Sequence, residues 1–347
     1  MSIELRSKIE KSIITMPKRI VTLGEILLRL SPPDHQSMKQ AKELEMNFGG
    51  SEANVALALC NFGMEGVVVS KVPDNALGQS AINHFRRYGV NTDYILKGGN
   101  RLGLYFLESG TWARPSRVIY DRAQSSMSLA KRDEFDFDKI LEDADWFHTS
   151  GITTAISEES AEVALQAMKT AKAKGITTSF DINFRQKIWS AEKARPWLTK
   201  LCEQADVYIG NTGHASLLLD VDCSNTRNYE NVFSALYDRF GFKYIACTSR
   251  KVQSASQNEI SALVSDGKRS YRSKEYSVSI IDRVGSGDAF AAGLIYGLLD
   301  GRSLENAAAF GIASCALKHT YPGDATYSTV EEVKALVAGN SSAHVQR

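Results

Sequence analysis

The chain has 347 residues, of which 43% are hydrophobic, enough to bury the core of one large α/β domain or of two smaller ones. Its 41 lysines and arginines nearly balance its 40 aspartates and glutamates, and the net charge of +1 argues against binding to nucleic acid or to a membrane surface. The 5 cysteines are far apart and include no C-x-x-C pair, which disfavours a disulfide framework or a zinc site and favours a reducing cytoplasm. We expect a protein whose partner is a small molecule.

The two ends of the sequence differ from its middle. Residues 1–18 carry charges throughout and lack the apolar segment of a signal peptide, so we expect an N-terminal extension. Residues 336–347 are expected to form a C-terminal tail, and no stretch of the sequence is long and apolar enough to cross a bilayer. Residues 19–335 are therefore expected to form the folded domain.

From residue 19 onward, short apolar runs alternate with segments of helical periodicity. The expected strands are residues 19–30, 66–72, 144–151, 176–183, 205–211 and 243–249. The expected helices are residues 51–63, 76–89, 157–175, 190–205 and 230–241, followed by a helix of small residues that starts near residue 288. Strands and helices that alternate in this way form right-handed βαβ units. The sequence therefore predicts the α/β class, as a three-layer α/β/α domain with a mostly parallel sheet covered on both faces.

One region interrupts this alternation. Residues 101–122 show two alternating strands around a polar turn, which predicts a β-hairpin without a crossover helix. Such a hairpin needs partner strands, and the candidates are residues 27–33 and 39–47. An addition of this kind commonly covers a binding site or forms a dimer contact. We therefore expect a small β lid, built mainly from residues 27–47 and 101–122, and a homo-oligomer formed through it.

A glycine turn late in the chain is the first candidate for chemistry. The sequence has neither G-x-x-x-x-G-K-[ST] nor a G-x-G-x-x-G run after its first strand, so a P-loop enzyme and an ordinary dinucleotide dehydrogenase are not supported. Residues 282–293 instead read DRVGSGDAFAAG. Gly285, Ser286 and Gly287 can leave backbone N–H groups pointing outward at a helix start, where anions bind. Asp288 can either cap that helix or remove a proton from a hydroxyl that attacks a bound phosphoryl group.

A second glycine pair lies early in the chain. Gly49 and Gly50 precede the expected helix 51–63 and let a ligand approach the backbone. Asn54, one turn into that helix, can offer both a donor and an acceptor to a sugar hydroxyl. The alternative is an ordinary glycine turn that Asn54 caps locally.

These two motifs, residues 49–56 and 282–290, resemble the two signatures of the ribokinase-like (PfkB) carbohydrate kinases. Together with the alternation between them, the similarity covers residues 19–335. The resemblance implies a ribokinase-like fold and transfer of a phosphoryl group from ATP with Mg²⁺. It also implies that the amides of residues 285–287 form the anion hole and that Asp288 is the catalytic base.

Within this family, the middle of the chain is similar to the 2-keto-3-deoxygluconate kinases. The similar segments are residues 150–157 and 180–190. Those enzymes also carry aromatic residues and an arginine on the lid, which Tyr105, Tyr120 and Arg122 match here. The resemblance therefore implies a sugar acid as substrate.

A physical argument favours the same substrate class. An open-chain sugar acid has a carboxylate, which Arg122 and Arg185 could hold through bidentate hydrogen bonds, whereas a neutral ketose would not need two arginines. The alternatives are a solvated lid charge for Arg122, a structural partner of Asp181 for Arg185, and lid packing for the two tyrosines. Asp324 resembles a substrate-side aspartate of these kinases but could equally be a turn residue. The expected substrate-binding residues are Gly49, Gly50, Asn54, Tyr105, Tyr120, Arg122, Arg185, Asp288 and Asp324.

The nucleotide side departs from the family pattern. Members usually have an N-x-x-E motif whose glutamate helps to organise magnesium and phosphate, whereas here Asn211 is followed three residues later by His214. Members also tend to have a glycine where this chain has the run Cys247 to Lys251. Either Arg250 or Lys251 could contact phosphate there, and the alternative is a solvated charge pair. No metal ligand is assigned. The expected ATP-binding residues are Asn183, Asn211, Thr248, Arg250, Gly285 and Gly287.

The expected reaction is ATP-dependent phosphorylation of 2-keto-3-deoxygluconate on its C6 hydroxyl, which gives the 6-phosphate. Three alternatives remain open. A fructokinase would share every catalytic residue, and a 5-dehydro-2-deoxygluconokinase would use a similar acid. The third is a catalytically weakened sugar-binding sensor, because the nucleotide-side motifs are altered.

Overall fold

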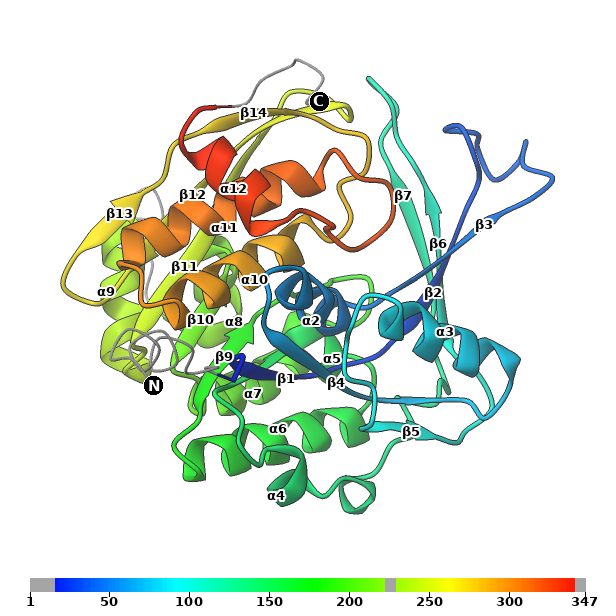
Figure 1. The fold of residues 1–347 in the computed structure, drawn as a ribbon, viewed down its shortest axis with the longest axis horizontal. Coiled ribbons are helices and arrows are strands. Elements are labelled where there is room, and N and C mark those ends of the chain that lie inside the picture. Colours follow the sequence, from blue (N-terminus) through cyan, green and yellow to red (C-terminus); the bar gives the residue numbers. More distant parts are fainter. Residues whose placement is uncertain (1–15, 222–228, 341–347) are drawn as a thin grey trace, which may run out of the picture.

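The computed structural model describes residues 16–221 and 229–340 (Figure 1). The expected N-terminal extension and C-terminal tail therefore lie largely outside the described residues. Helix α12 (Val330–Val337) passes the expected end of the domain at residue 335. No helix within the described ranges is long and apolar enough to cross a membrane.

A 10-stranded sheet forms the centre of the molecule. Its order is β13 (Ser270–Arg272), β12 (Gln257–Ser265), β11 (Tyr244–Val252), β10 (Val207–Gly210), β9 (Thr177–Asp181), β8 (Trp146–Ser150), β1 (Arg19–Leu23), β4 (Glu65–Val72) and β5 (Ile95–Lys97), and β14 (Tyr276–Ser279) pairs with β12. Neighbouring strands from β11 to β5 run parallel, whereas β12 is antiparallel to β11, β13 and β14. The predicted α/β class with a mostly parallel sheet is confirmed.

Helices cover both faces of this sheet, because its central strands are apolar on both sides. In β1, Val21 and Leu23 belong to one buried cluster and Ile20 to another, on the opposite face. On the first face lie α6 (Glu158–Ala173), α7 (Ala191–Cys202), α8 (Thr212–Leu219) and α9 (Tyr229–Phe240), with the short helices α4 (Phe137–Ile140) and α5 (Gly151–Thr154). On the second lie α2 (Ser51–Asn61), α10 (Ser286–Leu299), α11 (Leu304–Lys318) and α12 (Figure 1).

A second sheet has four strands, in the order β3 (Glu45–Gly49), β2 (Leu27–Ser31), β6 (Gly103–Glu108) and β7 (Arg117–Asp121). We call it the lid after the role predicted for it. Strands β6 and β7 form the expected antiparallel hairpin, and β2 and β3 come from the segments expected to pair with it. Helix α3 (Ala76–Arg86) packs near one end of the lid. In Figure 1 the lid stands beside the main sheet and projects away from it.

The expected single strand over residues 19–30 is wrong. The chain leaves the main sheet after β1 and enters the lid as β2, with Gly24 and Glu25 at the corner. A Cβ atom on Gly24 would lie 2.0 Å from a carboxylate oxygen of Glu52, so only glycine fits there. Because residues 20–29 are all buried and mostly apolar, their hydrophobic pattern does not show where one sheet ends and the other begins.

Candidate active site

A cavity of about 620 Å³ lies between the lid and the carboxyl ends of the parallel strands, where ligands of open α/β sheets commonly bind. It brings together most of the residues expected from the sequence. Those that line it are Gly50, Asn54, Tyr105, Tyr120, Asn183, Arg185, Asn211, Thr248, Arg250, Gly285, Ser286, Gly287, Asp288 and Asp324. Two expected residues, Gly49 and Arg122, do not line it.

The start of α10 forms one wall of the cavity. Gly285 has a φ of 77°, and a Cβ atom there would lie 1.6 Å from the backbone oxygen of Asp324, so the turn requires glycine. A Cβ on Gly287 would meet nothing within 4 Å, which leaves the backbone open toward the cavity. The turn therefore presents accessible N–H groups at a helix N-terminus, as an anion site requires.

Asp288 is held from outside its own helix. Its Oδ1 accepts a hydrogen bond from Ser51 Oγ at 2.7 Å, and its Oδ2 accepts one from Asn54 Nδ2 at 2.7 Å. These donors come from α2, whereas a capping aspartate would accept bonds from backbone amides of its own first turn. Burial raises the pKa of Asp288, and the bonds from Asn54 and Ser51 partly oppose that rise. The carboxyl group is thus fixed in direction and made more basic, as a general base should be.

Asn183 extends this hydrogen-bond chain. Its Nδ2 donates to Ser51 Oγ at 2.9 Å, so the single hydroxyl proton of Ser51 is directed at Asp288. The backbone of Asn183 has a φ of 35°, in the left-handed region, and its N–H donates to Asp181 Oδ1 at 3.0 Å. Asn183, expected to bind ATP, therefore also orients Ser51.

Asp181, which also lines the cavity, was considered from sequence only as a partner for Arg185. No ion pair joins the two residues in the described part of the chain. Burial, and after it the nearby Asp288 carboxylate, raises the pKa of Asp181 to about 7. Its position at the end of β9, one of the central parallel strands, was the signal that could have identified it.

Asp324 is an ionic link between the cavity wall and the lid. Arg29 Nη1 lies 2.7 Å from Asp324 Oδ1 and 2.8 Å from Asp282 Oδ2, and Tyr105 donates its hydroxyl proton to Asp324 Oδ2 at 2.5 Å. Burial opposes the charged form of Arg29, but Asp324 and Asp282 together raise its pKa. Burial and then Asp324 raise the pKa of Tyr105. Asp324 is therefore more than a turn residue, and Arg29 is a positioning residue that the sequence did not reveal.

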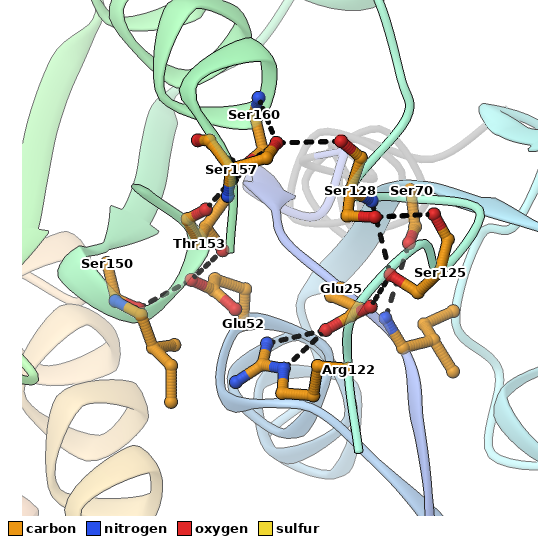
Figure 2. A network of polar contacts seen from close by, with 12 residues as sticks. Glu25, Glu52, Ser70, Arg122, Ser125, Ser128, Ser150, Thr153, Ser157 and Ser160 are labelled. Atoms are coloured by element: carbon orange, nitrogen blue, oxygen red, sulfur yellow. Dashed lines mark hydrogen bonds and ion pairs between the residues drawn. The ribbon is translucent and has the colours of Figure 1, made fainter. Parts of the chain in front are cut away.

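Arg122 does not lie in the cavity as expected. Its Nε and Nη2 both lie 2.6 Å from Glu25 Oε2, and Ser125 donates to the other oxygen of the same carboxylate (Figure 2). Only 7% of the Arg122 side chain is exposed. Its charge is balanced by Glu25, so it is neither a solvated lid charge nor available to a substrate carboxylate in this conformation. The pair instead joins the end of β7 to the corner between β1 and β2.

A second buried carboxylate lies beside this pair. Glu52 Oε1 accepts hydrogen bonds from Ser150 Oγ at 2.6 Å and Thr153 Oγ1 at 2.7 Å, which tie the start of α2 to the start of α5 (Figure 2). Burial raises the pKa of Glu52. Gly49 has a similar structural role, because a Cβ atom there would lie 2.4 Å from Asp324 Oδ2. Glu52 and Gly49, both from the early motif, therefore support the cavity wall without lining the cavity.

Three arginines face the cavity without an ion pair in the described part of the chain: Arg185, Arg250 and Arg283. Arg250 Nη2 donates to Ser286 Oγ at 3.3 Å, within the glycine turn. Burial and then the neighbouring Arg250 lower the pKa of Arg283, a residue that sequence reasoning missed. Three cations beside an anion-binding turn are suited to phosphate and carboxylate groups.

On the side of the expected ATP-binding residues, an adjoining cavity of about 160 Å³ is lined in part by Asn211, Thr248 and Arg185. Asn211 caps α8, because its side chain accepts a hydrogen bond from Gly213 N at 2.7 Å. His214, at the position of the family's glutamate, packs edge-on against Phe184 with ring centroids 5.6 Å apart. No cluster of three potential metal-ligating side chains occurs among the described residues.

Comparison with known proteins places this geometry in a family. The model of the pfkB family carbohydrate kinases matches residues 17–331. A 2-dehydro-3-deoxygalactonokinase of Haloferax volcanii is 34% identical over 94% of this chain and 99% of its own length. A 5-dehydro-2-deoxygluconokinase of Clostridium perfringens is 28% identical over 92% of each chain.

A solved structure agrees with these matches. The 2-dehydro-3-deoxygluconokinase of Thermotoga maritima has 42% sequence identity and a TM-score of 0.91, covering 93% of this chain and 99% of the other. The predicted ribokinase-like fold and carbohydrate kinase activity are confirmed by these likenesses. With its glycine turn, its half-buried aspartate and its lid, the chain belongs to the pfkB family of carbohydrate kinases.

Proposed function

We propose that this kinase transfers the γ-phosphoryl group of ATP to a 2-keto-3-deoxy sugar acid, with 2-keto-3-deoxygluconate and its C6 hydroxyl as the first candidate. The observation that carries the proposal is the placement of Asp288 and the glycine turn in one cavity with three unpaired arginines. A neutral sugar would account for the base and the turn, but it has no carboxylate for Arg185 or Arg283 to bind.

In the proposed reaction, Asp288 accepts the proton of the attacking hydroxyl as the oxygen forms a bond to the γ-phosphorus. The bond from that phosphorus to the β,γ-bridging oxygen breaks, and ADP leaves. The amides of residues 285–287 and Arg250 stabilise the charge on the transferred group. Asp181, which lines the cavity, would help to hold nucleotide-bound Mg²⁺, and that ion would supply further charge neutralisation at the phosphates.

The substrate would lie between the lid and α2. Asn54 is 3% exposed and its Oδ1 has no hydrogen-bond partner in the described residues, so it is free to accept a bond from a sugar hydroxyl. Tyr105 and Tyr120 face the cavity from the lid. With Arg122 committed to Glu25, the substrate carboxylate is left to Arg185, helped by Arg283.

The 4-epimer, 2-keto-3-deoxygalactonate, is the second candidate, because the Haloferax volcanii relative is named for it. A 5-dehydro-2-deoxygluconate kinase and a fructokinase remain as alternatives of the same chemistry. The hydrogen bonds that hold Asp288 and the open glycine turn favour a kinase over the sensor alternative. The dispersed cysteines support a reducing, cytoplasmic setting for the reaction.

The test is an ADP-release assay on the two 2-keto-3-deoxy acids, 5-dehydro-2-deoxygluconate and fructose. We expect one of the 2-keto-3-deoxy acids to have the highest kcat/KM, and a preference for fructose would overturn the substrate class. Asp288→Asn should lower kcat by roughly 10²- to 10⁴-fold with little change in sugar binding, because the amide keeps the shape but not the basicity. Near-normal kcat in that variant would refute the assignment of the base.

A further inference from the structure

Lys318, the last residue of α11, is a buried titratable group that the proposed reaction does not use. Its side chain is 0% exposed. The ammonium group donates hydrogen bonds to two backbone oxygens, that of Asp282 at 3.2 Å and that of Tyr321 at 3.1 Å. A lysine buried this completely is unusual without a partner of opposite charge or a specific task.

The two carbonyl groups belong to segments that form the cavity wall. One segment, residues 282–287, is the glycine turn, and the other, residues 321–324, carries Asp324 into the cavity. Asp282 joins them, because its carboxylate accepts hydrogen bonds from Val284 N at 3.0 Å and from Gly323 N at 3.1 Å. Gly285 also lies directly against the backbone of Asp324, so neither segment can shift without the other.

The charged groups near Lys318 have a net charge of zero only if the ammonium group of Lys318 is included. Arg29 contacts both Asp282 and Asp324, which puts one guanidinium against two carboxylates, and the ammonium group makes the cluster neutral. Burial lowers the pKa of Lys318, and Asp282 and Asp324 oppose only part of that fall. Without the ammonium group, two carbonyl oxygens would lose their donor and a net negative charge would remain buried. That charge would lie beside the place where a phosphoryl group must arrive.

We propose that Lys318 is a positioning residue whose ammonium group acts as a built-in cation, tying residues 282–287 to residues 321–324 and so holding the anion-site amides ready for the phosphoryl group. The inference rests on the proposed function for its account of what the amides bind. The tie that Lys318 makes between the two segments does not depend on which sugar the enzyme binds. Lys318 touches no reacting atom, so it acts through the turn and not on the substrate.

The test measures amide hydrogen exchange in the ligand-free protein. In Lys318→Ala, amides of residues 282–287 and 321–324 should exchange at least about tenfold faster than in the wild type, while α6 stays unchanged. Ile312→Ala is the matched control, because Ile312 is also fully buried on α11 but lies in the helix-packing cluster. The control should lower the melting temperature without a selective increase of amide exchange in the two segments. Equal exchange of those segments in Lys318→Ala and wild type would overturn the proposal.

Chemical rescue separates the ammonium charge from packing. Ammonium or methylammonium chloride should restore part of the protection and of kcat to Lys318→Ala, and tetramethylammonium at equal ionic strength should not. No difference between these cations would refute the role of a bound charge. Should Lys318→Ala fail to fold, Lys318→Gln is only one bond shorter than lysine and keeps an N–H donor but loses the charge. Wild-type exchange in Lys318→Gln would then overturn the proposal. Asp288→Asn tests the proposed function separately, because it should lose activity while amide exchange in residues 282–287 and 321–324 stays normal.

Discussion

Asp288 illustrates how the surroundings of one side chain decide its role. The sequence allowed it to be either a helix cap or a base, and the distinction depends on where its two oxygens point. Both are bound by side chains of α2, more than 230 positions earlier in the sequence. Ser51 supplies one of these donors and is itself oriented by Asn183. Because the Ser51 hydroxyl accepts a hydrogen bond from Asn183 while it donates one to Asp288, it holds the carboxylate more firmly than a hydroxyl without that acceptor bond would.

The first prediction concerns Ser51. Its hydrogen bond stabilises the ionised form of Asp288, so Ser51→Ala should raise the pKa of that carboxyl above its already raised value. Because the ionised form is the active base, the acid limb of the kcat/KM profile should move to higher pH. At neutral pH kcat should fall by roughly 3- to 10-fold, the size of one hydrogen bond.

The measurement is the pH–rate profile of Ser51→Ala beside Ser51→Thr, which keeps the hydroxyl and should restore the limb. Adding Ser51→Ala to Asp288→Asn should cost little more, since the two changes act on one group. An unmoved acid limb in Ser51→Ala would show that the hydroxyl serves packing alone.

The second prediction concerns Arg185 and substrate class. An acid that loses its guanidinium partner leaves a charge unpaired, whereas a neutral sugar does not. Arg185→Ala should therefore weaken binding of 2-keto-3-deoxygluconate roughly 30-fold or more, with little change in the KM for ATP. Binding of fructose should change far less, and Arg185→Lys should rescue in part because it restores the charge but not the planar fork.

Arg195→Ala serves as the control, because Arg195 is an exposed arginine whose side chain bonds a backbone oxygen outside the cavity. Equal losses for the acid and the neutral sugar would assign Arg185 to the scaffold or to the phosphates. Its place in both the main cavity and the adjoining one makes the phosphates the specific rival.

At the scale of elements, hydrophobic periodicity predicted the central strands and helices because they are buried on defined faces. It failed where two sheets meet at Gly24, since a buried corner has the same composition as a buried strand. Strands β12 to β14 were also not assigned, because they return antiparallel at the edge of the sheet without a helix between them. Arg122 was misplaced for a related reason. Its partner Glu25 is 97 residues away, and no local pattern shows that the two are buried together.

The lid is fastened at both ends. Its base is held by the ion pairs of Arg122 with Glu25 and of Arg29 with Asp324. Its tip bonds the β11–β12 hairpin, where Ala255 N donates to Trp112 O at 2.9 Å. The buried pairs at the base resist opening, so motion of the lid should be concentrated at the tip.

The third prediction follows from this difference between the ion-paired base of the lid and its tip. A bound sugar acid should close the tip and slow amide exchange in residues 101–122 and at Ala255, while the strand ends nearest the base change little. Hydrogen exchange with and without a saturating acid measures this, and α6 provides an internal reference. Identical exchange of the hairpin in both states would rule out a lid function.

At the scale of the whole molecule, the outer face of the lid carries a row of partly exposed apolar side chains. The strand register aligns Met46, Leu30, Phe106 and Ile119 in one row across all four lid strands. Met46 is 53% exposed and Ile119 is 60% exposed. The alternate residues of the same strands, Tyr105 and Tyr120 among them, face the cavity, so one sheet offers a polar site on one side and an apolar row on the other. A row of this kind on the surface favours association.

The last prediction is therefore that two copies pair through this row, face to face about a twofold axis, so that each sheet covers the other's apolar side chains. Sedimentation velocity should give a dimer for the wild type and a monomer for the double variant Met46→Lys and Ile119→Lys, because four buried ammonium groups would then meet across the interface. Leu217→Lys is the control, since Leu217 is 40% exposed on α8 and should leave the dimer intact. The monomer should also show a higher KM for the sugar acid, because the lid strands that carry Tyr105 and Tyr120 would lose their support. A wild type that sediments as a monomer at micromolar concentration would contradict the role of the lid as an interface, and a double variant that remains dimeric would place the contact elsewhere.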